Sequence, residues 1–247
     1  RQLNRHVFAA ARDVIVLDQA MRSRVEFSVP EASAKISVIP SWADTEAIKP
    51  LPKQSNWFVQ RYQLDQTFNV LYSGNQGRCH DLVTVVAAAM LLRQRPDIRF
   101  IFIGAGPQNE RIRALADDWG LSNCLFLPYQ DLDVLPYSLT AADLAVVSLG
   151  IHADGLVAPS KVYGHLAAGT PLAVVAPSSS DICQLVVDDL GRCFRNGDAS
   201  GLADFICQLV EEPQLLASYS ARCRRAAIER FGRDSAALAY RRVLMGY

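Results

Sequence analysis

The sequence predicts an α/β protein in which a doubly wound parallel sheet carries helices on both of its faces. From Phe68 onward, short apolar runs alternate with helical patterns of about 10 to 15 residues, the arrangement of consecutive β–α–β units. The runs FIFIG and LAVVSL are almost continuously apolar, which is typical of strands that are buried on both faces. Two of the runs end in glycine, which favours a tight turn into the next helix.

Each element of this part of the chain follows from its local pattern. Strands are expected over residues 68–74, 99–106, 124–128, 143–149 and 171–177. Helices are expected over residues 80–94, 107–120, 133–142, 159–169, 180–191 and 199–212, and a basic amphipathic segment follows over 215–230. The helix over 107–120 has a proline in its first turn and a glycine at its end, which are the usual start and stop signals.

The residues before Phe68 have a different organisation. Residues 1–40 show the order helix, strand, helix, strand, and Pro40 ends the second strand. Residues 41–67 are mostly polar and are broken by Pro50 and Pro52, which is typical of a connection between domains. Since the chain begins with Arg1 rather than Met, we expect it to be a piece of a longer protein. The predicted parts are residues 1–40, a linker over 41–67, the main domain over 68–230 and a C-terminal helix over 231–247.

The composition is that of a folded protein without an excess of either charge. The chain has 247 residues, half of them hydrophobic, with 25 basic and 25 acidic residues. These values exclude a disordered segment, a collagen-like repeat and a small disulfide-stapled protein. They also argue against a dedicated nucleic-acid-binding protein, which needs an excess of Lys and Arg. We recognise no signal peptide, and no apolar run approaches the roughly 18 residues of a membrane span.

The cysteines are scattered along the chain. They form no C-x-x-C pair and no group with histidine at the spacing of a metal site: Cys79, Cys124, Cys183, Cys193, Cys207 and Cys223. We expect them to be small, buried residues in a reducing compartment. The sequence therefore predicts free thiols and no metal site.

The ligand site of an open parallel sheet lies beyond the carboxyl ends of its strands. The first strand of the main domain is followed by SGNQGR, residues 73–78, a glycine-bearing turn that leads into a helix. Gly74 and Gly77 allow close approach of the backbone to a ligand, and Arg78 can donate two hydrogen bonds to a phosphate. Such a turn is a weak sign by itself, so phosphate binding and a plain structural turn both remain open. His80 is equally compatible with a ligand contact and with a helix cap.

The next two strand ends are less distinctive. GAGP, residues 104–107, lacks the third glycine of a dinucleotide-binding loop, so we expect a tight structural turn there. LPYQD, residues 127–131, places Tyr129 where its ring and the neighbouring backbone can flank a planar base.

Lys161 is distinguished by its isolation. The chain has four lysines, and the other three all precede residue 54. Pro159 and Ser160 form a typical helix start, so Lys161 lies in the first turn, where the helix dipole disfavours a cation unless an anion shares the site. This position favours a functional role for Lys161 over a solvent-exposed side chain. His165, one turn later, is expected to be packed or hydrogen-bonded rather than catalytic.

Taken in order, these segments resemble the donor-binding half of a retaining glycosyltransferase of family 4, which has the GT-B fold. KISVIPSWAD resembles the strand and linker that leave the acceptor domain of that family, and VLYSGNQGRCHDL resembles its first donor-domain loop. FIFIGAGP resembles the second strand, and NCLFLPYQDLDVLPYSLTAADLAVVSL resembles the segment that binds the nucleobase. PSKVYGHLAAGTPLAVV resembles the signature of the bacterial branch that assembles cell-surface polysaccharides. The resemblance covers nearly the whole chain and implies a Rossmann-like half of a GT-B fold together with the end of the other half.

The resemblance implies three groups of contacts with a nucleoside-diphosphate sugar. The turn after the first strand lies beside the diphosphate, the helix start at Lys161 binds the same phosphates from the opposite loop, and the third strand end borders the base. The residues implied are Gly74, Asn75, Gly77, Arg78, Leu127, Tyr129, Gln130, Ser160 and Lys161. Fixed cations and helix N–H groups then stabilise the departing nucleoside diphosphate without a metal ion or another cofactor.

Two departures from the family pattern stand out. The family commonly has a Glu-x7-Glu pair, whose second Glu holds the donor ribose, but these positions fall on Leu156 and Gly164. A ribose contact then has to come from elsewhere, and Asp154 is the candidate. The acceptor domain of the family, with the His often placed by the reaction centre, falls before Arg1, so the chain alone is expected to be largely inactive.

The expected function is transfer of a hexose from a UDP- or GDP-sugar to a saccharide or lipid-linked acceptor in cell-surface polysaccharide synthesis. One alternative is a degenerate, non-enzymatic module that binds a nucleotide or a partner, which the missing Glu pair favours and the retained cations oppose. The other is a sugar-nucleotide epimerase, which needs acid and base carboxylates that the sequence does not place. We expect a cytoplasmic protein, with the inner face of the plasma membrane as the alternative location.

The C-terminal segment carries an apolar stripe beside basic residues. Tyr240, Leu244 and Tyr247 share one helical face, and we expect this face to pack back on the acceptor domain, with a plain surface helix as the alternative. The preceding segment carries four arginines, expected on a solvated helix face with anionic lipid as the alternative contact: Arg222, Arg224, Arg225 and Arg230.

Overall fold

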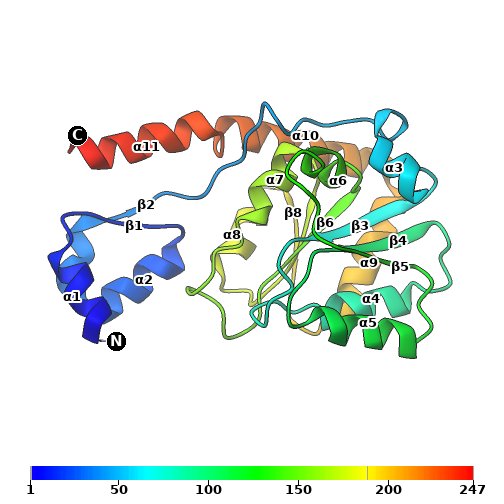
Figure 1. The fold of residues 1–247 in the computed structure, drawn as a ribbon, viewed down its shortest axis with the longest axis horizontal. Coiled ribbons are helices and arrows are strands. Elements are labelled where there is room, and N and C mark those ends of the chain that lie inside the picture. The colour runs from blue at the N-terminus through cyan, green and yellow to red at the C-terminus, as the bar shows by residue number, and fades with distance from the viewer. Residues whose placement is uncertain (1, 188, 247) are drawn as a thin grey trace.

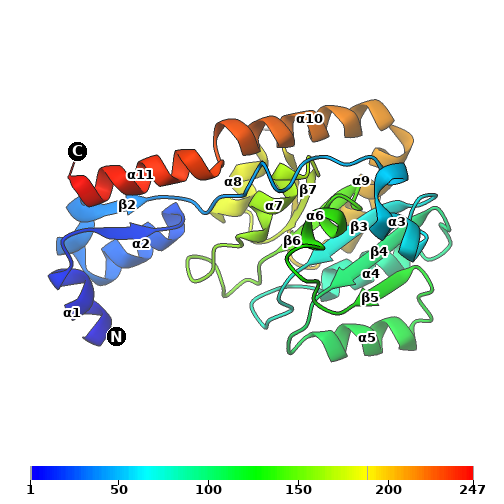
Figure 2. The same cartoon turned by 45° about the horizontal axis from the view of Figure 1, so that its top comes forward.

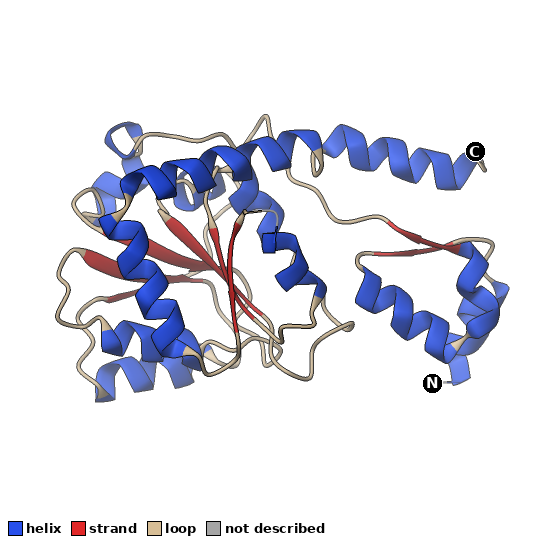
Figure 3. Cartoon of the chain, turned by 180° about the vertical axis from the view of Figure 1, so that it is seen from behind, coloured by secondary structure: helices blue, strands red, loops and turns tan. Residues whose placement is uncertain are grey.

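The main domain is built on a six-stranded parallel sheet, which confirms the predicted fold class (Figures 1 and 3). The computed structural model describes residues 2–187 and 189–246. The strand order is β5-β4-β3-β6-β7-β8, so the chain runs to one side of the sheet from β3 and then returns to continue on the other side from β6. The strands are β3 (Phe68–Ser73), β4 (Ile98–Ile103), β5 (Cys124–Leu127), β6 (Leu144–Ser148), β7 (Leu172–Val175) and β8 (Gly191–Phe194).

Helices cover both faces of the sheet because successive strand side chains point to opposite faces. One core cluster joins the sheet to α4 (Val83–Leu91), α5 (Asn109–Asp118) and α9 (Ala199–Glu211). A second cluster joins the other face to α3 (Trp57–Tyr62), α6 (Leu135–Leu139), α7 (Lys161–Ala167), α8 (Asp181–Val187) and α10 (Pro213–Glu229). Along β3, Tyr72 belongs to the first cluster and its neighbour Leu71 to the second, which is the alternation expected of a doubly covered strand.

Two elements of the main domain were not predicted. Strand β8 carries Arg192 and Cys193 between Gly191 and Phe194, so its short pattern lacks the apolar run that identifies the other strands. Helix α3 lies inside the predicted linker, after the 3-10 turn η2 (Lys53–Ser55). Because Phe58 and Val59 of α3 are fully buried in the second cluster, the connection over 41–67 is shorter than expected and its last part packs with the sheet.

The first part of the chain forms a small separate unit. It contains α1 (Gln2–Ala10), β1 (Val14–Val16), α2 (Gln19–Ser28), the 3-10 helix η1 (Pro30–Lys35) and β2 (Ile36–Val38). Strands β1 and β2 pair in parallel, and their core contains Val14, Val16 and Ile36. Figures 1 and 2 show this unit beside the main domain, with α11 (Arg233–Met245) extending from α10 toward it.

The two connections between these parts run side by side. The amide of Ala43 donates to the carbonyl of Phe231 at 3.1 Å, and Ala43 also forms a parallel bridge with Gly232. On α11, the ring of Tyr240 packs edge-on against Trp42, and Arg12 of the small unit donates to the carbonyls of Val243 and Leu244. Helix α11 therefore contacts both the linker and the small unit, whereas Tyr247 of the predicted stripe lies outside the described residues.

Arg224 of α10 has a structural position rather than the exposed one expected of it. Its guanidinium donates to the carbonyls of Thr45, Ile48 and Ala167 at 2.8–2.9 Å, so it ties the linker to the end of α7. Arg222 also bonds within the chain, to the carbonyl of Asp189 at 3.0 Å. Only part of the arginine set therefore faces solvent.

The expectation of free thiols is wrong for one pair of cysteines. Cys183 of α8 and Cys193 of β8 form a disulfide with their Cα atoms 5.4 Å apart. The pair was not recognised because the partners are ten residues apart and β8 itself was not predicted. In the described part of the chain, no helix is long and apolar enough to cross a membrane.

Candidate functional site

The candidate site lies where the strand order reverses, between β3 and β6. Ligands of open α/β sheets bind outside the carboxyl ends of the strands at such a switch point. The loops after the two strands are joined there: His80 Nδ1 donates to the carbonyl of Ser148 at 2.6 Å, and the amide of Gly150 donates to the carbonyl of Cys79 at 2.7 Å. His80 is buried, so it holds the two loops together instead of capping a helix at the surface.

Two glycines allow the loops to approach one another closely. At Gly74, which has φ +126°, a Cβ atom would lie 3.3 Å from both Cε and Nζ of Lys161. At Gly104, with φ +128°, a Cβ atom would lie 2.1 Å from the carbonyl oxygen of Gly74. The GAGP segment is therefore a tight turn against the first loop, and Gly74 leaves room for the lysine side chain.

Lys161 is the most unusual charged group of the site. It is the first residue of α7, and its buried Nζ atom has no hydrogen-bond partner among the residues that the structure describes. The ammonium lies over the ring of Tyr72, 3.6 Å from the ring centroid. Burial lowers the pKa of Lys161 to about 7, and the nearby thiol of Cys79 opposes this shift only in part.

The other titratable groups around Lys161 do not supply a counter-ion. Burial lowers the pKa of His80, the hydrogen bond to Ser148 opposes the shift, and the charge of Lys161 adds to it. Burial, and then Lys161, lowers the pKa of His165 to about 3. Both rings are therefore neutral near pH 7, and the ring nitrogens of buried His165 have no hydrogen-bond partner within the described chain. Neither histidine therefore provides Lys161 with a counter-ion.

The remaining phosphate-side candidates are more exposed. Arg78 and Asn75 of the first loop are exposed, and so is Ser160, whose hydroxyl does not cap α7. Gly77 is buried beneath Asn75, since a Cβ atom there would lie 3.2 Å from Asn75 Nδ2. The structure therefore brings Gly74 and Lys161 into contact and leaves the side chains of Asn75, Arg78 and Ser160 at the surface.

The residues predicted to border the base differ in their exposure and in their contacts. Tyr129 is 55% exposed, and its hydroxyl donates to the carbonyl of Ala105 at 3.3 Å, so its ring borders the GAGP turn. Gln130 folds back, with Nε2 donating to the carbonyl of Pro128 at 2.8 Å. The side chain of Leu127 is buried in the second core cluster, so it packs beneath the loops.

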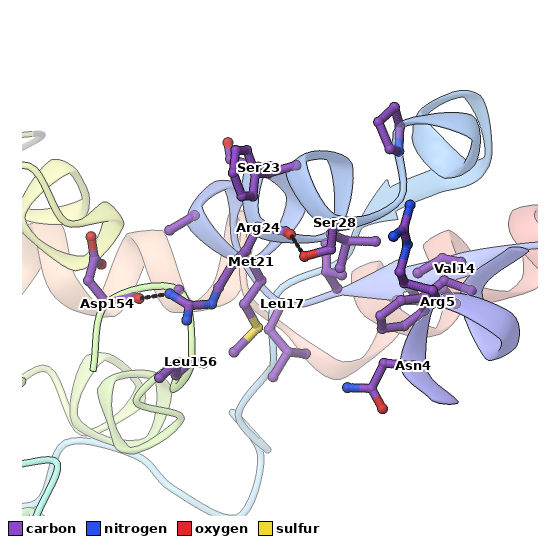
Figure 4. Close-up of a pocket in the computed structure, with 18 residues that line it drawn as sticks. Asn4, Arg5, Val14, Leu17, Met21, Ser23, Arg24, Ser28, Asp154 and Leu156 are labelled. Atoms are coloured by element: carbon purple, nitrogen blue, oxygen red, sulfur yellow. Dashed lines mark hydrogen bonds between the residues drawn. The ribbon is translucent and has the colours of Figure 1, made fainter. Parts of the chain in front are cut away.

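Asp154 lies on the side of the site that faces the small unit (Figure 4). It lines a groove of about 1300 Å3 with residues of α1, β1 and α2, and its carbonyl accepts a bond from Arg24 at 3.5 Å. Ala20 in α2 also donates to the carboxylate of Asp181 at 2.8 Å. The Asp154 segment is therefore part of the contact between the small unit and the main domain.

The two positions of the family's Glu pair also differ in environment. Leu156 is exposed and lines the same groove. At Gly164 a Cβ atom would lie 3.1 Å from Leu139 Cδ1 and 4.0 Å from Ile48 Cδ1. A longer side chain at position 164 would have to displace this apolar packing.

Several residues that shape the site were not predicted. The hydroxyl of Tyr72 donates to the carbonyl of Asn75 at 2.6 Å, in addition to the contact of its ring with Lys161. Gln108 Nε2 donates to the carbonyls of Gly77 and His80, and Asn109 donates at 2.6 Å to Gln76, which is buried and lies within the predicted loop. A polar hydroxyl at the end of an apolar strand was the only available signal for Tyr72. Across the residues described, no three His, Cys, Asp or Glu side chains are arranged to hold a metal ion.

Two known proteins with similar sequences are both named as glycosyl transferases. Over 169 residues, the chain is 32% identical to WcaI of Escherichia coli (strain K12), a glycosyl transferase whose name assigns it to colanic acid biosynthesis, and the match covers 66% of this chain. Over 214 residues and 85% of this chain, it is 24% identical to WbjE of Pseudomonas aeruginosa, which is named a glycosyltransferase. The matches cover 41% and 53% of these two proteins, so the chain spans about half of their length.

The fold is shared with solved structures. The structure of Anabaena Alr3699/HepE in complex with UDP and glucose superposes with a TM-score of 0.82 at 18% sequence identity, covering 100% of this chain and 68% of that one. The similarity shows the GT-B fold. The family model described as glycosyl transferases group 1 matches residues 67–212, which is more than half of the chain. This chain therefore belongs to the group 1 glycosyl transferases.

Proposed function

We propose that the chain supplies the donor-binding half of a retaining glycosyltransferase of family 4. The observation that carries the proposal is the buried ammonium of Lys161, which has no hydrogen-bond partner among the described residues and lies against Gly74 at the switch point. A buried cation without a counter-ion is costly unless a ligand provides one. A diphosphate provides both the negative charge and the acceptor atoms.

The proposed chemistry places these groups at the leaving group. When the bond between the anomeric carbon and the β-phosphate oxygen breaks, negative charge develops on the nucleoside diphosphate. Lys161 and Arg78 stabilise that charge from opposite loops, Ser160 adds a hydroxyl donor, and the stabilisation requires no metal ion. Tyr129 borders the base, and Asp154 remains the candidate for the ribose.

The relatives support a choice of donor and acceptor to test first. A complex of a similar fold with UDP and glucose supports a uridine diphosphate hexose as the first donor to test, with the GDP-sugar as the alternative. The name of WcaI, which assigns it to colanic acid biosynthesis, supports a role in polysaccharide synthesis, and we propose a saccharide or lipid-linked acceptor there. Since the chain spans about half of that relative, turnover belongs to the longer protein.

The first test is calorimetric titration of the chain with UDP-glucose, UDP, GDP and ADP. We expect one nucleoside diphosphate to bind selectively, and Lys161→Met to weaken its binding about 30-fold to 160-fold, since a charge-assisted contact is worth roughly 2–3 kcal/mol. Lys49→Met is the matched control because Lys49 lies in an exposed ion pair with Glu46. Equal affinity of wild type and Lys161→Met would refute the phosphate role.

Arg78→Ala provides a second, weaker test. Its side chain is exposed in the free protein, so we expect about a fivefold to tenfold loss of UDP-glucose affinity without loss of stability. Unchanged affinity in the chain and unchanged turnover in the full-length enzyme would remove Arg78 from the site. Proton NMR of the product of the full-length enzyme tests retention, because the two anomers differ in their coupling constants.

A second candidate function is a binding module without transferase activity. The observation that favours it is the packing of Gly164 against Leu139 and Ile48, which leaves no carboxylate where the family commonly holds the ribose. Selective nucleotide binding by the chain, combined with no turnover of any donor by the full-length protein, would favour this function over catalysis.

A further inference from the structure

Tyr72 contacts both sides of the site from the end of β3. The face of its ring lies 3.6 Å from Lys161 Nζ, and its hydroxyl donates to the carbonyl of Asn75 at 2.6 Å. Tyr72 is 1% exposed and is held by its register pairing with Phe102 on β4. Burial raises the pKa of Tyr72, so the hydroxyl stays protonated and available as a donor.

We propose that Tyr72 is a positioning residue for nucleotide-sugar binding, because its ring holds the Lys161 ammonium while its hydroxyl fixes the backbone of the first loop. This inference rests on the proposed function, in which both elements meet the diphosphate. It adds a residue that touches neither the phosphates nor the sugar.

The geometry requires such a residue. Lys161 starts a short helix, and its long side chain has many rotamers, among which no hydrogen bond to a described residue selects one. A cation over an aromatic face is attracted by the ring, most strongly where water is excluded. Gly74 closes the other side, since an added Cβ atom would lie 3.3 Å from Nζ. The ammonium is therefore held beside the first loop before a ligand arrives.

The two functions of Tyr72 can be separated by substitution. Tyr72→Phe keeps the ring and removes the bond to Asn75, whereas Tyr72→Leu removes both. Phe102→Leu is the matched control, because Phe102 is equally buried in the same core cluster and pairs with Tyr72 across the sheet. Similar thermal unfolding of Tyr72→Leu and Phe102→Leu isolates the effect on Lys161.

The contact is measured without any ligand by NMR of the chain with carbon-13 at the lysine Cε positions. Four lysines give four signals, and the signal absent from Lys161→Met identifies Lys161. We expect this signal to be shifted upfield by the ring in wild type, Tyr72→Phe and Phe102→Leu, and to lose the shift in Tyr72→Leu. We also expect Lys161 to titrate at lower pH in Tyr72→Leu, since the ring no longer favours the charged form. Absence of the ring shift in wild type would overturn the proposal.

The consequence for binding is measured with UDP-glucose. Tyr72→Leu is expected to weaken binding at least about tenfold, and Tyr72→Phe about threefold to fivefold, with Phe102→Leu unchanged. Equal affinity of Tyr72→Leu and Phe102→Leu would overturn the positioning role while leaving the proposed function intact. If wild type shows the ring shift but binds no nucleotide, the proposed function fails and the positioning role fails with it.

Discussion

Helix α7 has a cation at each end, and the two cations differ in their hydrogen-bond partners. At its last residue, the carbonyl of Ala167 accepts a bond from Arg224, whose guanidinium has two further carbonyl partners in the linker. At its first residue, Lys161 has a buried ammonium without a hydrogen-bond partner among the residues described. A satisfied cation stabilises the fold, whereas an unsatisfied one lowers stability and is available to a ligand. The state of its partners therefore distinguishes a structural cation from a functional one in this protein.

The largest effect is expected on stability when Arg224, the cation with three hydrogen-bond partners, is replaced. Arg224→Met leaves three part-buried carbonyls without their donor, so we expect the free energy of unfolding to fall by about 3 kcal/mol. Urea denaturation measures the change. Arg225→Met is the matched control, because Arg225 is the exposed neighbour on the same helix, and we expect it to change stability by less than about 0.5 kcal/mol. If folded Arg224→Met binds UDP-glucose within twofold of wild type, Arg224 has a structural role only. A loss of affinity comparable to that of Lys161→Met would contradict the distinction between the two cations.

The next effect is the pH dependence of UDP-glucose binding at Lys161, the cation without a hydrogen-bond partner among the described residues. The pKa of Lys161 is lowered to about 7, and a bound diphosphate favours the ammonium and raises this pKa. Binding then takes up a proton above pH 7, so affinity for UDP-glucose should be highest below about pH 7 and fall up to tenfold per pH unit above it. Calorimetry between pH 6.5 and 9 at about constant ionic strength measures this. The diphosphate of a nucleotide sugar is a diester and keeps its charge over this range.

Two variants test the assignment of that pH dependence. Cys79→Ser removes the sulfur that partly opposes the pKa shift of Lys161 and should leave the profile in place, because burial is the larger cause of that shift. Lys161→Met should abolish the profile. A flat profile in wild type would show that Lys161 is already charged in the free protein.

The smallest effect is expected on the stability of Lys161→Met itself. The pKa of Lys161 is lower in the folded than in the unfolded chain, so its burial destabilises the fold in full below about pH 7 and progressively less toward the unfolded value of about 10.4. We expect Lys161→Met to raise the free energy of unfolding by about 1 kcal/mol at pH 7 and by less at pH 9. A marked loss of stability at pH 7 would mean that the ammonium has a partner and is structural.

The fold could be predicted where an apolar run in the sequence identifies a strand. Strands β3 to β7 have such runs, whereas β8 is an edge strand that carries Arg192 and was missed. Helix α3 was missed because its six residues lie among prolines and polar residues, although Phe58 is fully buried. The disulfide depended on β8 and could not be predicted without it.

The site could be predicted only where one residue carried its own signal. Lys161 was found because a lone lysine at a helix start is unusual, and Gly74 because a glycine follows an apolar strand. The contact between Lys161 and Tyr72 joins residues 89 positions apart, so no local spacing contains it. Likewise, the partners of Arg224 are backbone carbonyls, which every residue has and no sequence pattern marks.

The pairing at Ala43 joins the two connections between the small unit and the main domain. Helix α10 ends at Glu229 and α11 begins at Arg233, and Gly232, the residue that Ala43 pairs with, lies between them. Helix α10 is tied to the main domain through Arg224, while Arg12 ties α11 to the small unit. The two helices therefore belong to different parts of the molecule, and the linker and the helical connection are fastened to each other at the point where one part gives way to the other.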